Sequence, residues 1–544
     1  MFSLAARAAG LAAWRGMSQP SGSPAVPNET PPVCSGPLLR WEILFLIALV
    51  TGLLAAFLLK SKVTYLGHDD FCTTTLLSNP HFGEMLETIG NGGEVNPPLL
   101  FVLGWGVARV FGTGELPMRA LSAFPLMLAA VVTFFALRRA VGSRPAALST
   151  VLVFGLSHSV FDFMYSARYY GLFTLVAALA AFLFVKISGG KKLERSDLLF
   201  VFLVQTALVW LHLFGWFFSG MWFAGLLLMD WLRGRRRWSL YAAVICAWAT
   251  FVLWLPALQR QLQVTRDGTW TPRMSFAEFV EEPAMQTPLT RVFLLLAILG
   301  LAVFVTKRGG EAGEKISSKG KLLPLLVLGL AWMAVPFGTW AASQVIKPFY
   351  MQRYVAPCVI ALSCLVGVVV WWIEQLPRAA RARLPAWLEK MTWTGITVFC
   401  LVFQSLRALR DGPRPARAFN DLDFGHPQLP MVFEDSMGYL IRAYYGRGRE
   451  YAMIIDRDAA EADPGYFTKL EERYFSKFRP HYADKLRILS FNELPEWPEG
   501  FLAVKTSPAK TWEWIFAHHP ELKVKLIGNW PGGQRVYLVR RSKP

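Results

Sequence analysis

Residues 41–60 read WEILFLIALVTGLLAAFLLK, a run in which only Glu42 and Lys60 carry charge. About 20 apolar residues in a helix match the thickness of the hydrocarbon core of a bilayer. Ten further runs follow, and all are continuously apolar rather than alternating, which favours helices over a membrane barrel. The candidate spans are 41–60, 117–137, 146–163, 169–185, 197–212, 214–232, 238–256, 291–306, 322–343, 353–374 and 391–408. We therefore predict a polytopic α-helical membrane protein with about eleven transmembrane helices.

The composition of the whole chain agrees with this prediction. Of its 544 residues, 54% are hydrophobic and 17% are charged, against about 25% charged residues in soluble domains. These values exclude a soluble globule and a disordered chain. The six cysteines form no C-x-x-C pair, so neither a zinc site nor a disulfide framework is indicated.

The net charge of +18 is distributed in a way that reports topology. Basic residues gather in the short segments between apolar runs, as the positive-inside rule describes for cytosolic loops. These residues are Arg138, Arg139, Arg144, Lys186, Lys191, Lys192, Arg195, Arg233, Arg235, Arg236, Arg237, Lys307, Arg308, Lys315, Lys319, Lys321, Arg378, Arg381, Arg383 and Lys390. Because no basic stripe with interleaved aromatics stands on a soluble element, we expect no nucleic-acid partner.

The segment 97–112 decides the sidedness of the chain. It is short, opens with two prolines and contains Arg109. If it crossed the membrane, every later basic loop would lie outside the cell, so we expect it to lie in the interface instead. The tail 1–40 is then flexible and cytosolic, and the outer face carries the loop 61–116 and the segments 164–168, 257–290 and 344–352. This pattern predicts a bacterial inner membrane protein.

The composition changes abruptly at about Asp411. From there to residue 544 the apolar runs shrink to 4–6 residues and alternate with helical patterns. Short strands between helices indicate a small α/β domain. Predicted strands lie at 451–455, 486–490, 500–504, 524–527 and 535–539. We assign 41–410 to a transmembrane domain and 411–544 to a periplasmic or exoplasmic α/β domain.

Two adjacent carboxylates, Asp69 and Asp70, follow the first span within the sequence Tyr65-Leu-Gly-His-Asp-Asp-Phe-Cys-Thr73. Carboxylates at a membrane surface can act as a general base toward a hydroxyl or as ligands of a divalent cation. The structural alternative is that one of them is the N-cap of a short helix over 71–77.

The order of the features around this acidic pair resembles that of the GT-C superfamily of lipid-linked-sugar glycosyltransferases. The similarity is strongest to the protein O-mannosyltransferase and lipid A aminoarabinose transferase branch, and it covers residues 41 to about 408. The residues that carry it are Asp69, Asp70 and Thr73; Asn96, Pro97, Pro98 and Leu99; Phe111 and Gly112; Arg119; Tyr165 to Tyr170; and Arg353 and Tyr354. Two positions depart from the pattern, because Asp70 and Ser166 stand where relatives usually carry Glu.

The resemblance implies transfer of a sugar from a polyprenyl-phosphate donor to an acceptor hydroxyl on the outer face, the acceptor being a lipid such as lipid A, a glycan, a glycolipid or a protein. Such a reaction needs a base for the acceptor proton and positive charge on the departing phosphate. We expect Asp69 to be the base, with Asp70 supporting it. A divalent metal such as Mg²⁺ or Mn²⁺, held by Asp70 and Asp162, is an open alternative; Asp162 is equally compatible with a structural pair with Arg168.

Cations at the outer ends of spans are candidates for the donor phosphate. Arg168, Arg353 and Lys347 occupy such positions, and Arg offers a planar fork to phosphate oxygens. Tyr170 follows Arg168 in the same motif. The alternative for these cations is contact with lipid headgroups. Candidate contacts to donor or acceptor are His212, Asn96 and Trp270, of which His212 and Trp270 also suit structural or interfacial roles.

Two other function classes compete with the enzyme. A transporter or flippase of a lipid-linked saccharide predicts ionisable groups near the bilayer midplane and related halves, and the sequence shows neither. A noncatalytic scaffold gives no reason for an acidic pair to occur together with arginines at the outer ends of spans.

Overall fold

The structure, a computed structural model, describes residues 37–189, 193–266, 268–281, 316–374, 424–446, 449–506, 508–530 and 533–541. All of them belong to one compact unit, Gly36–Pro544. The predicted spans 291–306 and 391–408, the tail up to residue 36 and the predicted domain boundary near Asp411 lie outside the described residues.

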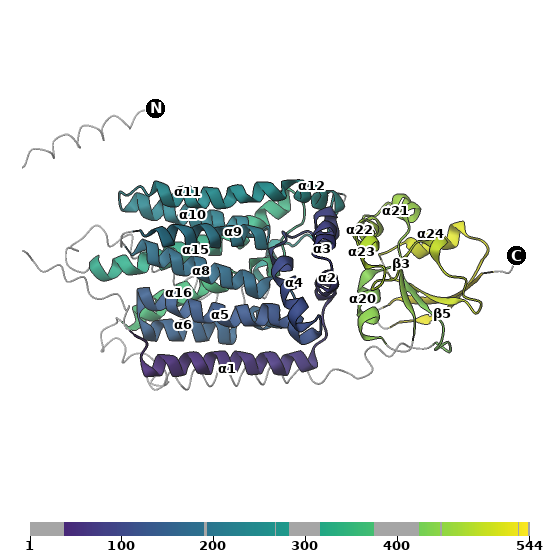
Figure 1. The fold of residues 1–544 in the computed structure, drawn as a ribbon, viewed down its shortest axis with the longest axis horizontal. Coiled ribbons are helices and arrows are strands. Elements are labelled where there is room, and N and C mark those ends of the chain that lie inside the picture. The colour runs from purple at the N-terminus through teal and green to yellow at the C-terminus, as the bar shows by residue number, and fades with distance from the viewer. Residues whose placement is uncertain are drawn as a thin grey trace, which may run out of the picture. The chain divides into compact units, whose positions relative to one another are not determined.

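The first part of the chain is helical, and its long helices run side by side (Figure 1). The elements up to residue 188 are α1 (Arg40–Val63), α2 (His68–Ser78), α3 (Phe82–Thr88), the π-helix η1 (Ile89–Gly93), α4 (Leu99–Phe111), α5 (Glu115–Val141), α6 (Ser143–Leu156), α7 (His158–Met164) and α8 (Tyr170–Ser188). The later ones are α9 (Arg195–Leu211), α10 (Gly215–Leu232), α11 (Trp238–Ala249), η2 (Thr250–Trp254), α12 (Leu255–Val264), α13 (Phe276–Glu281), α15 (Ile316–Val345), η5 (Gln352–Val355) and α16 (Cys358–Glu374).

Five helices in the described part are long and apolar enough to cross a membrane: Arg40–Lys62, Glu115–Val141, Tyr170–Ser188, Trp238–Val264 and Leu322–Val345. The count of about eleven is therefore not reached among these residues. Some predicted spans are broken, since 146–163 divides at Ser157 into α6 and α7, and 353–374 begins as the 3₁₀ turn η5. Helix α4 has 13 residues, about 20 Å, which is shorter than the hydrocarbon core.

A close crossing of α5 and α8 fixes the loop between α7 and α8. A Cβ atom on Gly171 would lie 1.8 Å from the carbonyl oxygen of Ser122, so only glycine allows this approach. The Ser122 hydroxyl donates to the carbonyl of Phe163 at 2.7 Å and accepts from the Gly171 N–H at 2.8 Å. Ser122 thus joins the end of α7 to the start of α8 and holds both ends of residues 165–169.

Several of the basic residues from which the topology was predicted also pair with acidic residues. The Arg138 Nε lies 2.8 Å from the buried Glu42 carboxylate, and Lys186 pairs with Asp197 at 2.5 Å. Arg237 pairs with Asp230 at 2.6 Å. Buried charges require such partners, so these basic residues also join neighbouring helices.

The last part of the described chain contains a six-stranded sheet with the order β3-β2-β1-β4-β6-β5. Neighbours from β3 to β4 are parallel, and β6 is antiparallel to β4 and β5. The strands are β1 (Met431–Phe433), β2 (Tyr451–Ile454), β3 (Ile488–Leu489), β4 (Phe501–Lys505), β5 (Leu522–Asn529) and β6 (Arg535–Arg541). The helices are α20 (Ser436–Tyr445), α21 (Arg457–Ala462), α22 (Phe467–Phe475), α23 (Arg479–Tyr482) and α24 (Thr511–His518), with the 3₁₀ turn η6 (Phe491–Glu493).

The two faces of this sheet bury different sets of side chains. Alternate residues of a strand point to opposite faces, so Met431 and Phe433 join the large core shared with the helical part, whereas Val432 packs with Trp512 of α24 in a separate cluster. Figure 1 shows α20, α22 and α23 on the side of the sheet nearer α2 and α3. The side-chain contacts below agree with that placement.

Helices α20 and α23 contact the segment after α1 directly. The Tyr445 hydroxyl accepts from the backbone N–H of Leu66 at 3.1 Å, and the Tyr482 hydroxyl donates to the carbonyl of Leu76 at 3.1 Å. The ring of Phe71 lies 5.1 Å from that of Tyr444. The N-terminus and the C-terminal half of α2 are therefore both held by the sheet-containing part of the chain.

Candidate active site

The candidate site begins at the N-terminus of α2, where Asp70 performs the structural role. The N-cap is Gly67 rather than either aspartate, and the Asp70 Oδ2 accepts from the Gly67 N–H at 2.9 Å. This is the return half of a capping box, in which the third helical residue reaches back to the cap. The predicted N-cap at Asp69 or Asp70 is thus wrong in position, although Asp70 does cap the helix.

The second oxygen of Asp70 holds the loop that precedes α8. Its Oδ1 accepts from the Ser166 hydroxyl and from the Ala167 N–H, both at 2.8 Å. Asp70 is buried, and burial raises the pKa of its carboxyl although the hydrogen bonds from Gly67 and Ser166 oppose this. Asp70 therefore ties α2 to the loop that carries Arg168.

Asp69, by contrast, keeps its carboxylate partly accessible, with a third of the side chain exposed. Its Oδ2 lies 2.9 Å from the Arg353 Nη2, and its Oδ1 lies 3.4 Å from the His68 Nδ1. Burial raises the pKa of Asp69, but the His68 hydrogen bond and the nearby Arg168 and Arg353 charges outweigh burial and lower it well below the usual value. Asp69 is therefore ionised at neutral pH.

Arg168 is buried in a polar cluster behind Asp69. Its Nη1 donates to the Glu94 Oε2 at 2.9 Å and to the Thr73 hydroxyl at 2.7 Å. The other Glu94 oxygen accepts from the Asn96 Nδ2 and from the Val95 N–H, both at 2.9 Å. Asn96, predicted as a ligand contact, thus holds the carboxylate that neutralises Arg168.

Asp162 has a different partner from the one predicted. Its side chain is exposed, and its Oδ1 accepts from the Tyr165 hydroxyl at 2.6 Å. The ion pair of Arg168 is with Glu94, with an N–O distance of 2.9 Å. The predicted structural pair of Asp162 with Arg168 is therefore replaced by a pair that the sequence analysis missed.

Aromatic rings surround the two arginines. Arg168 lies over the ring of Tyr169 and Arg353 over the ring of Tyr354, at 5.5 and 5.7 Å. Between these rings lies His212, with centroid distances of 4.3 Å to Tyr169 and 4.9 Å to Tyr354. Such rings attract cations through their electron-rich faces.

His212 and Tyr170 are both buried in this aromatic group. The Nδ1 of His212 accepts from the Phe214 N–H at 3.1 Å, which places the proton of the neutral ring on Nε2. The ring of Tyr170 packs against Phe163 at 4.9 Å. Both residues therefore lie in the wall around Arg168 and Arg353.

Two predicted site residues have other contacts. The Lys347 Nζ lies 3.3 Å from both the carbonyl and the hydroxyl oxygen of Thr265, just after α12. Trp270 is 39% exposed and its ring lies 5.5 Å from that of Tyr474 in α22. Trp270 thus joins the segment after α12 to the sheet-containing part of the chain.

The predicted metal ligands do not fit a metal ion. Both oxygens of Asp70 accept hydrogen bonds from the protein, and Asp162 is bonded to Tyr165. Within the described ranges, no three His, Cys, Asp or Glu side chains come together as a ligand group. We derive no step that requires Mg²⁺ or Mn²⁺.

A chain of hydrogen bonds leads from Asp69 into the sheet-containing part. The Nε2 of His68 lies 2.7 Å from the Ser436 hydroxyl, which donates to the Glu471 Oε1 at 3.0 Å. Burial raises the pKa of Glu471 to about 7, opposed by the charge of His68. Sequence reasoning missed Glu471, although an acidic residue on the buried face of α22 was a readable signal.

Glu471→Gln should flatten the pH dependence of stability. Between its ordinary pKa of 4.5 and about 7, the unfolded carboxyl ionises while the folded one keeps its proton, so this group lowers stability as pH rises. His68 and Asp435 also face Glu471 and modulate the effect. We expect the melting temperature of the purified protein to fall less from about pH 5 to about pH 7.5 in the variant than in the wild type. An equal change of melting temperature with pH in the variant and the wild type would show that Glu471 does not have a raised pKa in the folded protein.

No model of a known protein family matches the sequence, and no curated protein matches it. Among solved structures, ArnT from Cupriavidus metallidurans bound to undecaprenyl phosphate is 14% identical, with 92% of this chain and 98% of that chain covered and a TM-score of 0.54. The same protein in the apo state gives a TM-score of 0.53.

The apo oligosaccharyltransferase of Archaeoglobus fulgidus is also 14% identical, over 91% of this chain and 74% of that chain, with a TM-score of 0.42, which is too low to establish a common fold. The likeness to ArnT extends over nearly the full length of both chains, so it concerns the whole architecture and not one helix pair. The chain therefore has a fold similar to that of ArnT.

Proposed function

We propose that this chain is an integral-membrane glycosyltransferase that moves a sugar from a polyprenyl-phosphate-linked donor to an acceptor hydroxyl at the outer face of a bacterial inner membrane. The observation that carries the proposal is the partly exposed Asp69 carboxylate paired with Arg353 at 2.9 Å, with Arg168 close by. The likeness to ArnT, which has been crystallised bound to undecaprenyl phosphate, supports the class of donor.

The reaction requires two groups of opposite charge beside the anomeric carbon of the donor sugar. Asp69 removes the proton of the acceptor hydroxyl as its oxygen forms a bond to that carbon, and the electron pair of the breaking carbon–oxygen bond goes to the phosphate. A cation stabilises the charge that develops on the phosphate. Asp69 is the base and Arg353 is the cation, and the two side chains are in direct contact.

Donor binding has a consequence for the base. A carboxylate held well below its usual pKa is a weak base, and proton transfer is more efficient when the pKa lies nearer the working pH. When the donor phosphate draws the positive charge of Arg353 toward itself, that charge stabilises Asp69 less. The pKa of Asp69 then rises toward its ordinary value in the complex, where a stronger base is needed.

Arg353 and Arg168 differ in burial, and this difference indicates different roles in donor binding. Arg353 is 39% exposed, whereas the Arg168 side chain is 8% exposed and already neutralised by Glu94. We therefore assign direct phosphate contact to Arg353 and a positioning role to Arg168. The Arg353 Nε atom is buried without a hydrogen-bond partner in the described part of the chain, as expected of a donor that awaits an anionic ligand.

Arg353→Ala should weaken donor binding about tenfold to a hundredfold, the range of a hydrogen bond to a charged group. The measurement is equilibrium binding of a radiolabelled polyprenyl-phosphate sugar to purified protein. Lys347→Ala is the matched control, because Lys347 is a second predicted phosphate cation that instead contacts Thr265. Unchanged donor affinity in Arg353→Ala would refute the phosphate contact.

The reaction class is tested with a panel of radiolabelled polyprenyl-phosphate sugars, reconstituted protein and envelope extract that supplies the acceptor. Covalent label in lipid, glycan or protein identifies the acceptor class and the sugar. Movement of intact donor between leaflets without covalent transfer would instead favour a flippase of a lipid-linked saccharide.

A further inference from the structure

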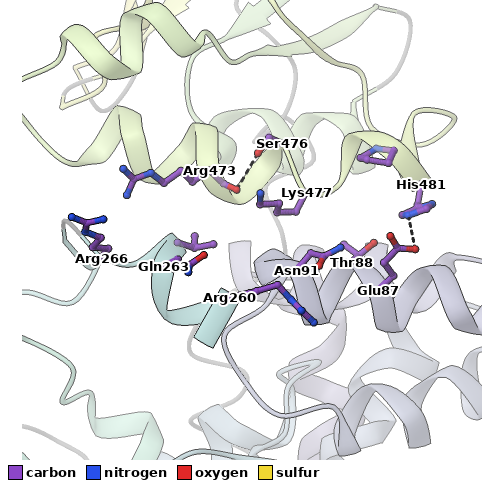
Figure 2. Close-up of a pocket in the computed structure, with 12 residues that line it drawn as sticks. Glu87, Thr88, Asn91, Arg260, Gln263, Arg266, Arg473, Ser476, Lys477 and His481 are labelled. Carbon is purple, nitrogen blue, oxygen red and sulfur yellow. Dashed lines mark hydrogen bonds and ion pairs between the residues drawn. The ribbon is translucent and has the colours of Figure 1, made fainter. Parts of the chain in front are cut away.

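A cavity that does not include the Asp69 group lies between α3, η1, α12 and the segment 473–481 (Figure 2). Its volume is about 580 Å³, which is within the range of small-molecule sites, about 300–1,000 Å³. None of the residues that line it belongs to the Asp69, Arg168 and Arg353 cluster. They are Glu87, Thr88, Asn91, Arg260, Gln263, Val264, Arg266, Arg473, Ser476, Lys477, Pro480 and His481.

Positive charge dominates this cavity. Arg260 and Arg266 lie on one side and Arg473 and Lys477 on the other, as Figure 2 shows. The one acidic lining residue, Glu87, lies 3.4 Å from the ring of His481, at the end away from Arg266. A cleft lined by charges of one sign concentrates the field and attracts a ligand of opposite charge.

The lining also contains neutral groups that suit sugar hydroxyls. The amides of Asn91 and Gln263 and the hydroxyl of Ser476 are placed among the cations. Amide and hydroxyl side chains can both donate and accept hydrogen bonds, as a saccharide requires. A site for a simple inorganic anion would have no use for so many neutral hydrogen-bonding groups.

The floor of the cavity is fixed to the backbone that leads to the Asp69 cluster. The Arg260 Nε donates to the carbonyl of Gly90 at 2.9 Å, and Gly92 has a φ of +103° with no room for a Cβ atom beside Val264. The chain then runs within two residues from Gly92 to Glu94, the partner of Arg168. A ligand in the cavity is therefore separated from the cluster by one short segment.

We propose that this cavity binds a phosphate- or carboxylate-bearing saccharide, and that this saccharide is the anionic part of the acceptor. The second clause rests on the proposed glycosyl transfer, whereas binding of an anionic saccharide does not. In this proposal, Arg260 of α12 and Arg473 of α22 hold the anionic group of the acceptor, and another part of the same molecule carries the hydroxyl that Asp69 deprotonates.

An anionic lipid headgroup offers the same phosphate chemistry from another source. Helix α12 ends a stretch long and apolar enough to cross a membrane, Trp238–Val264, so headgroups are a real competitor. The saccharide is favoured because the other side of the cavity is lined by Arg473 and Lys477, which belong to the sheet-containing part and not to an apolar helix.

Binding of trehalose 6-phosphate, with neutral trehalose as its uncharged match, tests the proposal on the purified full chain in phosphatidylcholine nanodiscs. We expect trehalose 6-phosphate to bind at least about tenfold more tightly than trehalose and the double variant R266Q/K477Q to lose this preference. The control K523Q/K525Q removes the same number of positive charges from exposed positions of β5. This control should keep the preference for trehalose 6-phosphate. Equal binding of the two sugars, or a preference that survives R266Q/K477Q, would overturn the proposal.

The source of the anion is settled by repeating the measurement in nanodiscs that contain phosphatidylglycerol. Retained binding of the sugar phosphate supports the saccharide, whereas its displacement by phosphatidylglycerol, reversed in R266Q/K477Q, would overturn it in favour of a lipid headgroup. Because this assay needs no turnover, a failure here is distinct from a failure of label transfer in the reaction assay. If transfer occurs, R266Q/K477Q should raise the KM for an anionic acceptor and leave the KM for the donor unchanged.

Discussion

Asp69→Asn should reduce sugar transfer by at least about a hundredfold, the lower end of what a general base contributes. Asparagine has nearly the same shape as aspartate but cannot take a proton from the acceptor hydroxyl. The helix should still form, since Asp70 and not Asp69 returns to the cap residue Gly67. Single-turnover transfer from labelled donor, measured at saturating donor and acceptor, isolates the chemical step from binding.

The matched control is Asp458→Asn, at an exposed position of α21. It makes the same chemical change outside the candidate site and should leave the rate unchanged. Turnover of Asp69→Asn at the wild-type rate, with wild-type donor affinity, would remove Asp69 as the base and leave it only a pairing role with Arg353.

Glu94→Ala should be strongly destabilising, by about 3–5 kcal/mol, because it leaves the buried Arg168 charge without its partner. Both side chains are less than a tenth exposed and pair at 2.9 Å. Glu94→Gln keeps an oxygen for the hydrogen bonds of Asn96 and should lose less. Denaturant or thermal unfolding in detergent, together with the yield of folded protein, measures the difference.

An exposed ion pair provides the control for this prediction. Arg457 and Glu461 lie 3.0 Å apart on α21 with most of each side chain exposed. Surface pairs contribute little to stability, so Glu461→Ala should leave the unfolding transition nearly unchanged. Equal destabilisation by Glu94→Ala and Glu461→Ala would contradict the buried ion pair as the support of the site.

Much of the helical architecture was predictable because bilayer thickness imposes a length and a composition that single sequences display. Helices α1, α5, α8 and α10 begin and end within four residues of the predicted spans. The break at Ser157 was not predicted, although three polar residues, Ser157, His158 and Ser159, interrupt the apolar run there. Whether a helix continues or ends at such residues depends on its packing against neighbouring helices, which the composition of one segment does not record.

The strands were predictable from short apolar runs between helical patterns. Strands β2 and β4 match the predicted 451–455 and 500–504 to within one residue at each end. The order of the strands was not predicted, because β1 pairs with β4 and β4 with β6, and sequence periodicity does not determine which strands pair. The contact of α20 with α2 is likewise between segments far apart in the chain.

The main charged residues of the candidate site were predicted from the sequence, but the residues that pair with them were not. The acidic pair after the first span indicated Asp69, and the cations at the outer ends of spans indicated Arg168 and Arg353; the structure brings these three residues together. The partner of Arg168 was missed because Glu94 lies in a Gly- and Pro-rich segment, where a carboxylate usually faces solvent. Only the fold of η1 onto α12 turns Glu94 inward.

The most direct test of the central claim compares wild type and Asp69→Asn in proteoliposomes, each given radiolabelled polyprenyl-phosphate sugar and envelope acceptor. We expect the wild-type protein to release free polyprenyl phosphate in an amount equal to the glycosylated acceptor, while Asp69→Asn binds the donor and releases almost no polyprenyl phosphate. Label that never enters an acceptor with any donor of the panel, from folded wild-type protein, would contradict glycosyl transfer.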